Sequence, residues 1–204
     1  MPLFEQPLDR LTPTQWDALI ALGLASDMCL HRFKRTMGLP RVQRVLGMLR
    51  SVSPTSLLDI GSGRGVFLWP LLDAFPTLPV TALDRLSYRV EDLLAVCAGG
   101  ITNLQAFEGD VTDLQFDDRS YDVITMLETL EHIPTPRAAV AEICRVASRY
   151  VILSVPSKPD SNPEHLHLFD QPTLTSLLQQ AGAARVSIDY VPGHMLAFAR
   201  MEHP

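Results

Sequence analysis

The sequence predicts an α/β fold in which a mostly parallel sheet carries helices on both faces and finishes with an antiparallel C-terminal strand. The first observation is that short apolar segments alternate with segments of helical spacing after residue 54, which implies parallel crossovers. The second is that several apolar segments end in an acid or a glycine, as strands do at a ligand-binding sheet edge. The third is Pro192-Gly193 between the last two apolar segments, which is a hairpin signal.

The chain begins with a helical extension, residues 1–53. A first helix is expected from Thr14 to Leu24, with Thr12 or Thr14 as its N-cap and Pro13 beside the cap. We expect the extension to act as a lid over the ligand-binding edge, and residues 54–204 to form the larger domain.

A second helix of the extension is expected over about residues 39–50. Its apolar positions have helical spacing and predict a face that packs inward, made of Val42, Val45, Leu46 and Leu49. The region between Asp27 and Asp59 has no acid but six basic residues: Arg32, Lys34, Arg35, Arg41, Arg44 and Arg50. Such a face either meets an anionic ligand or is an ordinary solvated helix surface. We favour the solvated surface, because the net charge of −6 opposes general nucleic-acid binding.

The remaining elements alternate along the chain. Helices are expected near residues 66–74, 88–98, 136–146 and 172–181. Strands are expected over residues 56–60, 80–84, 104–111, 121–127, 150–156, 184–191 and 194–200.

The first strand runs into a glycine-rich loop. Asp59 ends the strand, and Gly61, Gly63 and Gly65 follow at alternate positions. Glycines adopt positive φ and have no Cβ that would keep a ligand away from the backbone. The loop opens onto a helix N-terminus, whose N–H groups favour a carboxylate or another anion. We therefore expect the loop to cradle a cofactor.

Three later strands end in polar residues at the same predicted edge. Asp84 ends the second strand about 20 residues past the loop, where an acid can bind the ribose hydroxyls of an adenosine cofactor. Gly109-Asp110 ends the third strand, and the polar turn Glu128–His132 follows the fourth. The carboxyl ends of such strands form the edge at which open α/β sheets bind ligands.

From Leu57 to the C-terminus the chain resembles the class I S-adenosylmethionine-dependent methyltransferases, which have a Rossmann-like sheet. The resemblance lies in the order of the motifs. Leu57–Gly65, Ala82–Asp84 and Gly109–Val111 are similar to the first three motifs of the family. Tyr121–Pro134 and Tyr150–Pro156 are similar to its fourth and fifth strands with their loops.

Membership of this family implies which residues bind S-adenosylmethionine. Asp59 and the glycines at 61, 63 and 65 would hold the methionine end, Asp84 the ribose and Asp110 the adenine. Four neighbours complete the expected cofactor-binding set, namely Ser62, Arg85, Val111 and Leu127. A nicotinamide-binding turn would place its third glycine at position 66, where this chain has Val66, and this spacing disfavours an oxidoreductase.

The turn after the fourth strand supplies candidate catalytic groups. It holds Glu128, Glu131 and His132, and the loop after the fifth strand adds His165 and His167. Methyl transfer needs an aligned acceptor rather than a protein nucleophile, because the cofactor supplies the electrophile. A hydroxyl acceptor would also need a base. We expect Glu128, His132 and His167 to be the catalytic residues, with His132 or His167 as base.

Two other interpretations of the same residues stay open. Glu128, Glu131, His132 and His167 could bind a divalent metal ion that activates a ribose hydroxyl. This hypothesis rests on a resemblance to the small-RNA 2′-O-methyltransferases, which share a Glu-x-x-Glu-His turn and a His-x-Phe element, although their basic loop is much reduced here. Alternatively, the Glu-His pair only shapes the pocket, as in the ubiquinone-type O-methyltransferases that this region also resembles.

Composition limits the remaining possibilities. With 204 residues and 47% hydrophobic content, the chain can bury one substantial core. No apolar run suggests a membrane span or signal peptide, so we expect a cytoplasmic protein without a membrane partner. Cys29, Cys97 and Cys144 are far apart, which predicts core thiols rather than a disulfide framework or zinc site.

The sequence thus predicts an S-adenosylmethionine-dependent methyltransferase with a small-molecule acceptor. One alternative is a metal-assisted RNA ribose 2′-O-methyltransferase, whose nucleic-acid partner the net charge disfavours. A second is a module that binds S-adenosylmethionine without turning it over. The sequence leaves the acceptor, the use of a metal and the oligomeric state open.

Overall fold

The computed structural model describes residues 11–25, 33–34, 38–159 and 161–202. The chain forms two compact units, one ending at Lys34 and the other beginning at Arg35. Helix α1 (Pro13–Ala25) belongs to the first unit. The Thr12 hydroxyl accepts a hydrogen bond from the backbone N–H of Gln15 at 3.3 Å, so Thr12 is the N-cap of α1.

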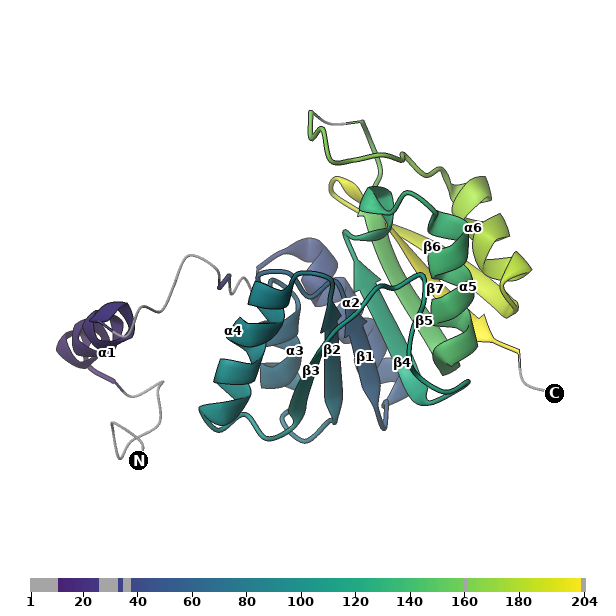
Figure 1. Ribbon diagram of the computed structural model, residues 1–204. Coiled ribbons are helices and arrows are strands. Elements are labelled where there is room, and N and C mark those ends of the chain that lie inside the picture. The colour runs from purple at the N-terminus through teal and green to yellow at the C-terminus, as the bar shows by residue number, and fades with distance from the viewer. Residues whose placement is uncertain (1–10, 26–32, 35–37, 160, 203–204) are drawn as a thin grey trace. The chain divides into compact units, whose positions relative to one another are not determined.

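The second unit is built on one seven-stranded sheet with the order β3-β2-β1-β4-β5-β7-β6 (Figure 1). The strands are β1 (Leu57–Ile60), β2 (Val80–Asp84), β3 (Leu104–Glu108), β4 (Tyr121–Leu127), β5 (Ala147–Pro156), β6 (Ala183–Val191) and β7 (His194–Met201). Strands β1 to β5 are parallel, whereas β7 pairs antiparallel with both β5 and β6. The sheet confirms the predicted fold class and the hairpin at Gly193, whose φ is 83°.

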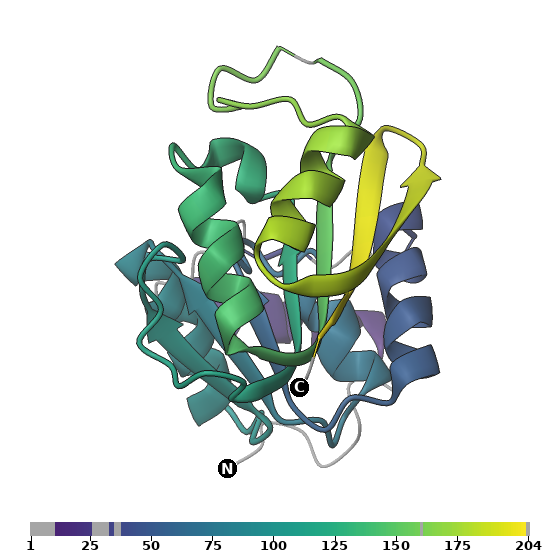
Figure 2. The same cartoon turned by 90° about the vertical axis from the view of Figure 1, so that its right-hand side faces the viewer.

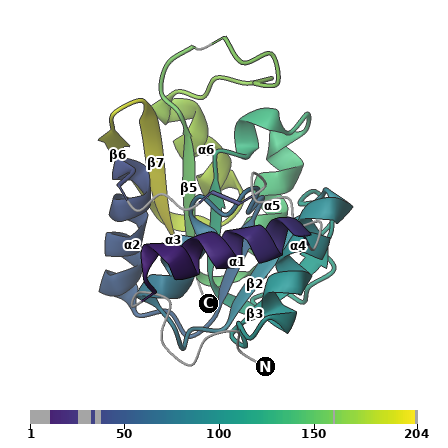
Figure 3. The same cartoon turned by 90° about the vertical axis from the view of Figure 1, so that its left-hand side faces the viewer.

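Helices cover both faces of the sheet, in two layers (Figures 2 and 3). They are α2 (Pro40–Val52), α3 (Leu68–Ala74), α4 (Ser87–Ala98), the short 3₁₀ helix η3 (Leu130–His132), α5 (Pro136–Val146) and α6 (Gln171–Gln180). Helices α2, α3 and α4 share one apolar core with one sheet face, and α5 and α6 share a second core with the other. Alternate residues of β1, β4, β5 and β7 supply the two cores, as the period of a β-strand requires.

Helix α2 packs into the second unit. Val45, Leu46 and Leu49 are fully buried, which confirms the inward face expected from their spacing. Arg44 and Arg50 are exposed on the opposite side, and Arg44 pairs with Asp189 of β6. That placement matches a solvated helix face.

The part of the basic stretch at Arg32 and Arg35 lies outside the described residues. The expected lid role of residues 1–53 stays a prediction.

The described cysteines are core thiols. Cys144 is buried, which raises its pKa to about 12, and the Cys97 thiol donates to the Leu104 carbonyl at 3.1 Å. Cys29 lies outside the described residues. Among the helices that are described, none has the length and apolar character needed to cross a membrane.

Candidate functional site

Two adjoining cavities open at the carboxyl edge of β1 to β4. The larger has a volume of about 880 Å³ and the smaller about 170 Å³. Gly61, Gly63 and Glu128 line both cavities. The predicted convergence of strand ends therefore produces a two-part site, and these three residues mark the junction of its parts.

The glycine loop after β1 needs its glycines. Gly61 and Gly63 have φ values of 70° and 58°, in the left-handed region that side chains disfavour. A Cβ on Gly61 would also overlap the Thr129 side chain. Gly65 does not line either cavity; a Cβ there would overlap the indole of Trp69, so its role is close packing behind the loop.

Asp84 fixes the loop against the start of α4. Its Oδ2 accepts from the Gly63 amide and its Oδ1 from the Leu86 amide, both at 3.0 Å. The side chain is buried yet lines the larger cavity, together with its neighbour Arg85. The carboxylate is thus pre-oriented at the place where the sequence predicts ribose binding.

Asp110 lies at the rim of the larger cavity, beside Val111. Its Oδ1 accepts from the amide and the hydroxyl of Thr112, at 2.8 Å and 2.7 Å. These bonds lower the pKa of Asp110, the amide bond contributing most.

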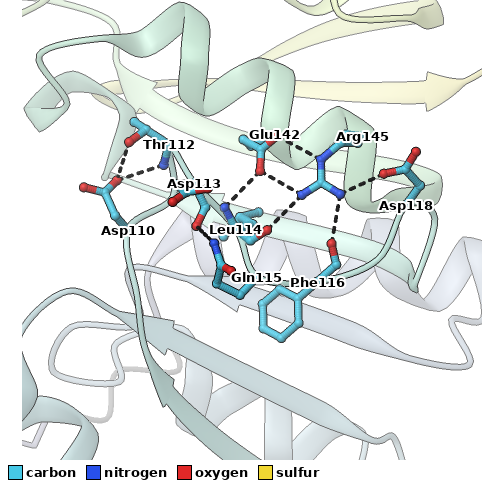
Figure 4. Close-up of polar contacts among 9 residues, drawn as sticks. All are labelled: Asp110, Thr112, Asp113, Leu114, Gln115, Phe116, Asp118, Glu142 and Arg145. Atoms are coloured by element: carbon cyan, nitrogen blue, oxygen red, sulfur yellow. Dashed lines mark hydrogen bonds and ion pairs between the residues drawn. The ribbon is translucent and has the colours of Figure 1, made fainter.

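A salt-bridge network anchors the segment that follows Asp110 (Figure 4). Arg145 of α5 donates to Glu142, to Asp118 and to the carbonyls of Leu114 and Phe116, at 2.8–2.9 Å. Glu142 in turn accepts from the Leu114 amide at 2.9 Å. The network therefore holds the chain between β3 and β4 against α5, and so fixes the cavity rim.

Asp59 is almost fully buried and lines the smaller cavity. Thr125 Oγ1 and Ser62 Oγ donate to its two oxygens at 2.7 Å and 2.8 Å. Burial raises the pKa of Asp59 to about 6, although both hydroxyl donors act in the opposite direction. Ser62 and Leu127 line the same cavity.

Glu128 has a strained backbone, with φ at 53° in the left-handed region. Ser154 Oγ donates to its Oε1 at 2.6 Å, and His194 Nδ1 of β7 lies 2.9 Å from its Oε2. Arg41 of α2 lies 3.2 Å from the other ring nitrogen of His194 and also lines the smaller cavity. Residues of β5 and β7 thus hold this carboxylate at the junction, and Arg41 of α2 supports it through His194.

The two histidines predicted to be catalytic have different positions. His132 lines the larger cavity, and its Nδ1 lies 2.9 Å from the Glu164 carbonyl oxygen. His167 is not among the residues that line either cavity, and its Nε2 lies 3.0 Å from the Ile133 carbonyl oxygen. The structure thus places His132, but not His167, at the wall of the site.

The four residues of the metal hypothesis are not brought together. Glu128 contacts Ser154 and His194, and His167 faces a backbone carbonyl. Glu131 and His132 instead meet His165, and side-chain ligand atoms of these three residues all lie within 4.8 Å of one another.

Comparison with known families gives the identification. A family model described as a methyltransferase domain matches residues 30–188 of the chain. The chain belongs to the class I S-adenosylmethionine-dependent methyltransferases. The matched span includes α2, the glycine loop and every cavity-lining residue named above.

Individual relatives of this methyltransferase are named for different activities. It is 35% identical over 136 residues to ribosomal RNA small subunit methyltransferase G of Ralstonia nicotianae, covering 61% of this chain and 60% of that one. It is 27% identical over 128 residues to the ubiquinone biosynthesis O-methyltransferase of Rickettsia prowazekii, covering 63% and 48%. The chain therefore spans between about half and three fifths of the length of these relatives.

A solved structure shows the same fold. Magnesium protoporphyrin IX methyltransferase from Synechocystis, solved with bound S-adenosylhomocysteine, superposes with a TM-score of 0.64 at 18% identity. The superposition covers 95% of this chain and 97% of that one.

Three residues of the methyltransferase site escape sequence reasoning. Arg41 belongs to a helix whose basic residues indicate a solvated face, and Ser154 reads as an ordinary position in a buried strand. His194 follows a hairpin turn, so the sequence favours a structural role. The predicted hairpin pairs β7 with β6, but it does not indicate that β7 also pairs with β5, which is what brings His194 to Glu128.

Proposed function

We propose that the chain binds S-adenosylmethionine across the two cavities, with adenosine in the larger one and the methionine end in the smaller one. Asp84 and Asp110 offer carboxylate oxygens to hydroxyl and amino groups in the larger cavity. Asp59 and Arg41 offer opposite charges to the ammonium and carboxylate in the smaller cavity. The sulfonium would then lie at the junction, beside Glu128.

We propose that the reaction is methyl transfer to an oxygen of a small molecule, with Glu128 as the general base. The observation that carries this proposal is the position of Glu128, held at the cavity junction in a strained conformation. An acceptor oxygen attacks the methyl carbon, the carbon–sulfur bond breaks, and its electron pair passes to sulfur. The proton of the acceptor hydroxyl passes to Glu128, and S-adenosylhomocysteine leaves.

The two histidines have different places in this proposal. His132, at the wall of the larger cavity, contacts and orients the acceptor. His167 lies outside both cavities, at the Ile133 carbonyl, and takes no part in methyl transfer in this proposal.

Cavity size and lining support a small organic acceptor. About 880 Å³ lies in the upper part of the range of roughly 300–1,000 Å³ found for small-molecule sites. Beyond the adenosine region the wall contains Ile133, Pro134 and Leu166 beside His132, a mixture that suits a partly apolar molecule. The name of the Rickettsia relative, an O-methyltransferase, agrees with an oxygen acceptor. The expected cytoplasmic location stays a prediction.

Glu128→Gln should lower methyl-transfer turnover by about 10²- to 10⁴-fold, because the amide cannot accept the acceptor proton. Radiolabelled S-adenosylmethionine would be incubated with a cellular metabolite extract and, separately, with total RNA. We expect label in the metabolite fraction, lost in Glu128→Gln and retained in Glu91→Gln, which changes an exposed position on α4. Label in RNA alone would overturn the small-molecule proposal, and full turnover by Glu128→Gln would overturn the base assignment.

Affinity for S-adenosylhomocysteine should rise about tenfold between pH 5 and pH 7, because the carboxyl of Asp59 has a pKa of about 6 and must ionise to pair with the ligand ammonium. The sign is opposite for the stability of the ligand-free protein. Folding raises the pKa of Asp59, so the stabilising contribution of its protonated carboxyl is present below the pKa of the unfolded chain. That contribution is lost as the pH rises through about 6. Calorimetric titration across this range should show the rise in the parent chain and a flat profile in Asp59→Asn.

A further inference from the structure

We propose that Glu131, His132 and His165 form a binding site for a divalent transition-metal ion at the rim of the larger cavity. Each residue offers one ligand atom, and the three atoms lie within 4.8 Å of one another. Two imidazole nitrogens and one carboxylate oxygen are a common donor set for such ions. The site differs from the residues of the methyl-transfer proposal except at His132, and ion binding does not depend on that proposal.

The distances leave room for an ion between the three groups. His132 Nε2 and His165 Nε2 each lie 4.0 Å from the same oxygen, Oε1 of Glu131. This separation is longer than a direct hydrogen bond. Ligands of a tetrahedral ion at about 2.1 Å are about 3.5 Å apart, so small side-chain rotations suffice to close the site.

The burial of Glu131 gives an electrostatic reason to expect a bound ion. Glu131 has no exposed surface, whereas the His132 and His165 side chains are 34% and 19% exposed. A buried carboxylate is costly unless positive charge or donors compensate it. An ion held between the imidazoles and Oε1 would place that positive charge next to the carboxylate.

The surrounding hydrogen bonds orient the ligands as metal sites do. The Glu164 carbonyl oxygen can only accept, so the Nδ1 of His132, 2.9 Å away, carries the hydrogen. In the neutral ring this leaves the Nε2 lone pair on the side of Glu131. Histidine ligands of metal ions usually donate their second N–H to a carbonyl or carboxylate in this way.

The backbone also fixes the loop that carries His165. The carbonyl oxygen of Glu131 accepts from the amides of Leu166 and His167, at 2.9 Å and 3.2 Å. The loop after β5 is thereby fastened to η3 on the C-terminal side of His165. Two segments distant in the sequence therefore present their ligand atoms in a fixed relation.

The donor set selects the class of ion. Two imidazoles with one carboxylate favour Zn²⁺, Mn²⁺, Fe²⁺ or Co²⁺ over Ca²⁺ and Mg²⁺, which prefer oxygen ligands. His132, Glu164 and Leu166 line the larger cavity. Of the three proposed ligands, His132 is the one that lines this cavity, so a free coordination position on the His132 side of the ion would face it, where water could bind.

The test uses Co²⁺ and Zn²⁺ as probes on the full chain after dialysis against a chelator. We expect one ion per chain by calorimetry, and for Co²⁺ a visible absorption band from imidazole ligation. His165→Asn and Glu131→Gln should each weaken binding by at least about tenfold. His167→Asn is the matched control, since His167 lies two residues further along the same loop but faces the Ile133 carbonyl, and it should bind like the parent.

The stoichiometry and the variants distinguish ion binding by the three named ligands from non-specific binding to surface histidines. Absence of stoichiometric binding in the parent would overturn the proposal, as would equal loss in His165→Asn and His167→Asn. Thermal unfolding of each variant shows whether it is folded. If Glu131→Gln fails to fold, His165→Asn and His132→Asn, whose side chains are partly exposed, carry the test. S-adenosylhomocysteine affinity of the same samples reports on the cofactor proposal separately, because that affinity does not require the ion.

Discussion

Asp84→Ala is expected to weaken binding of S-adenosylhomocysteine by about 1–3 kcal/mol, through loss of charge-assisted hydrogen bonds to the ribose. The same change leaves the amides of Gly63 and Leu86 without their carboxylate acceptor, which loosens the glycine loop. Both effects weaken binding of the same ligand, so we expect a loss of binding free energy nearer the upper end of this range. Isothermal titration of the variant and the parent chain measures the difference.

The control for Asp84 is Asp117→Ala, which removes the same charge at an exposed position outside both cavities. It should bind the ligand like the parent. Asp84→Asn keeps a side-chain oxygen that can accept from one of the two amides and should lie between parent and alanine variant. Unchanged affinity in Asp84→Ala would show that the ribose lies elsewhere.

Gly61→Ala is expected to remove measurable cofactor binding and to lower the free energy of unfolding by about 2–5 kcal/mol. About 1–2 kcal/mol comes from placing a side chain at φ 70°, and about 1–3 kcal/mol from overlap with Thr129. The loop must shift to relieve the overlap, and the shift displaces the backbone from the cavity junction. Chemical denaturation and ligand titration measure the two effects.

Two further variants separate the causes of the Gly61 effect. Gly47→Ala changes a glycine within α2 that has nothing within 4 Å of the added Cβ, and it should stabilise the chain by about 0.5–1 kcal/mol. The double variant Gly61→Ala with Thr129→Ala should recover the stability lost through overlap with Thr129. It should not recover the stability lost through the unfavourable φ angle. Parent-like binding by Gly61→Ala would contradict the close packing of this loop.

The fold follows from local patterns that the sequence displays. Helical spacing in α2 and the alternation of apolar segments with helices set the element types, and the structure agrees to within a few residues at most boundaries. The acids at Asp59, Asp84 and Asp110 predict the binding edge because parallel strands bring their carboxyl ends together. These features depend on chemistry within a few residues of each position.

The contacts that complete the site depend on long-range geometry and were not predictable. His194 reaches Glu128 only because β7 inserts next to β5, and Arg41 reaches His194 only through the packing of α2. Whether His165 or His167 lies near Glu131 depends on how the Glu131 carbonyl binds the loop. In the structure His165 lies beside the Glu131 carboxylate, and His167 lies at the Ile133 carbonyl.

A crystal structure of the chain with S-adenosylhomocysteine is the most direct test of the central claim. We expect the adenosine between Asp84 and Asp110, the amino-acid end beside Asp59, and the sulfur at the cavity junction next to Glu128. A ligand whose sulfur lies away from Glu128, or whose amino-acid end occupies the larger cavity, would contradict that claim.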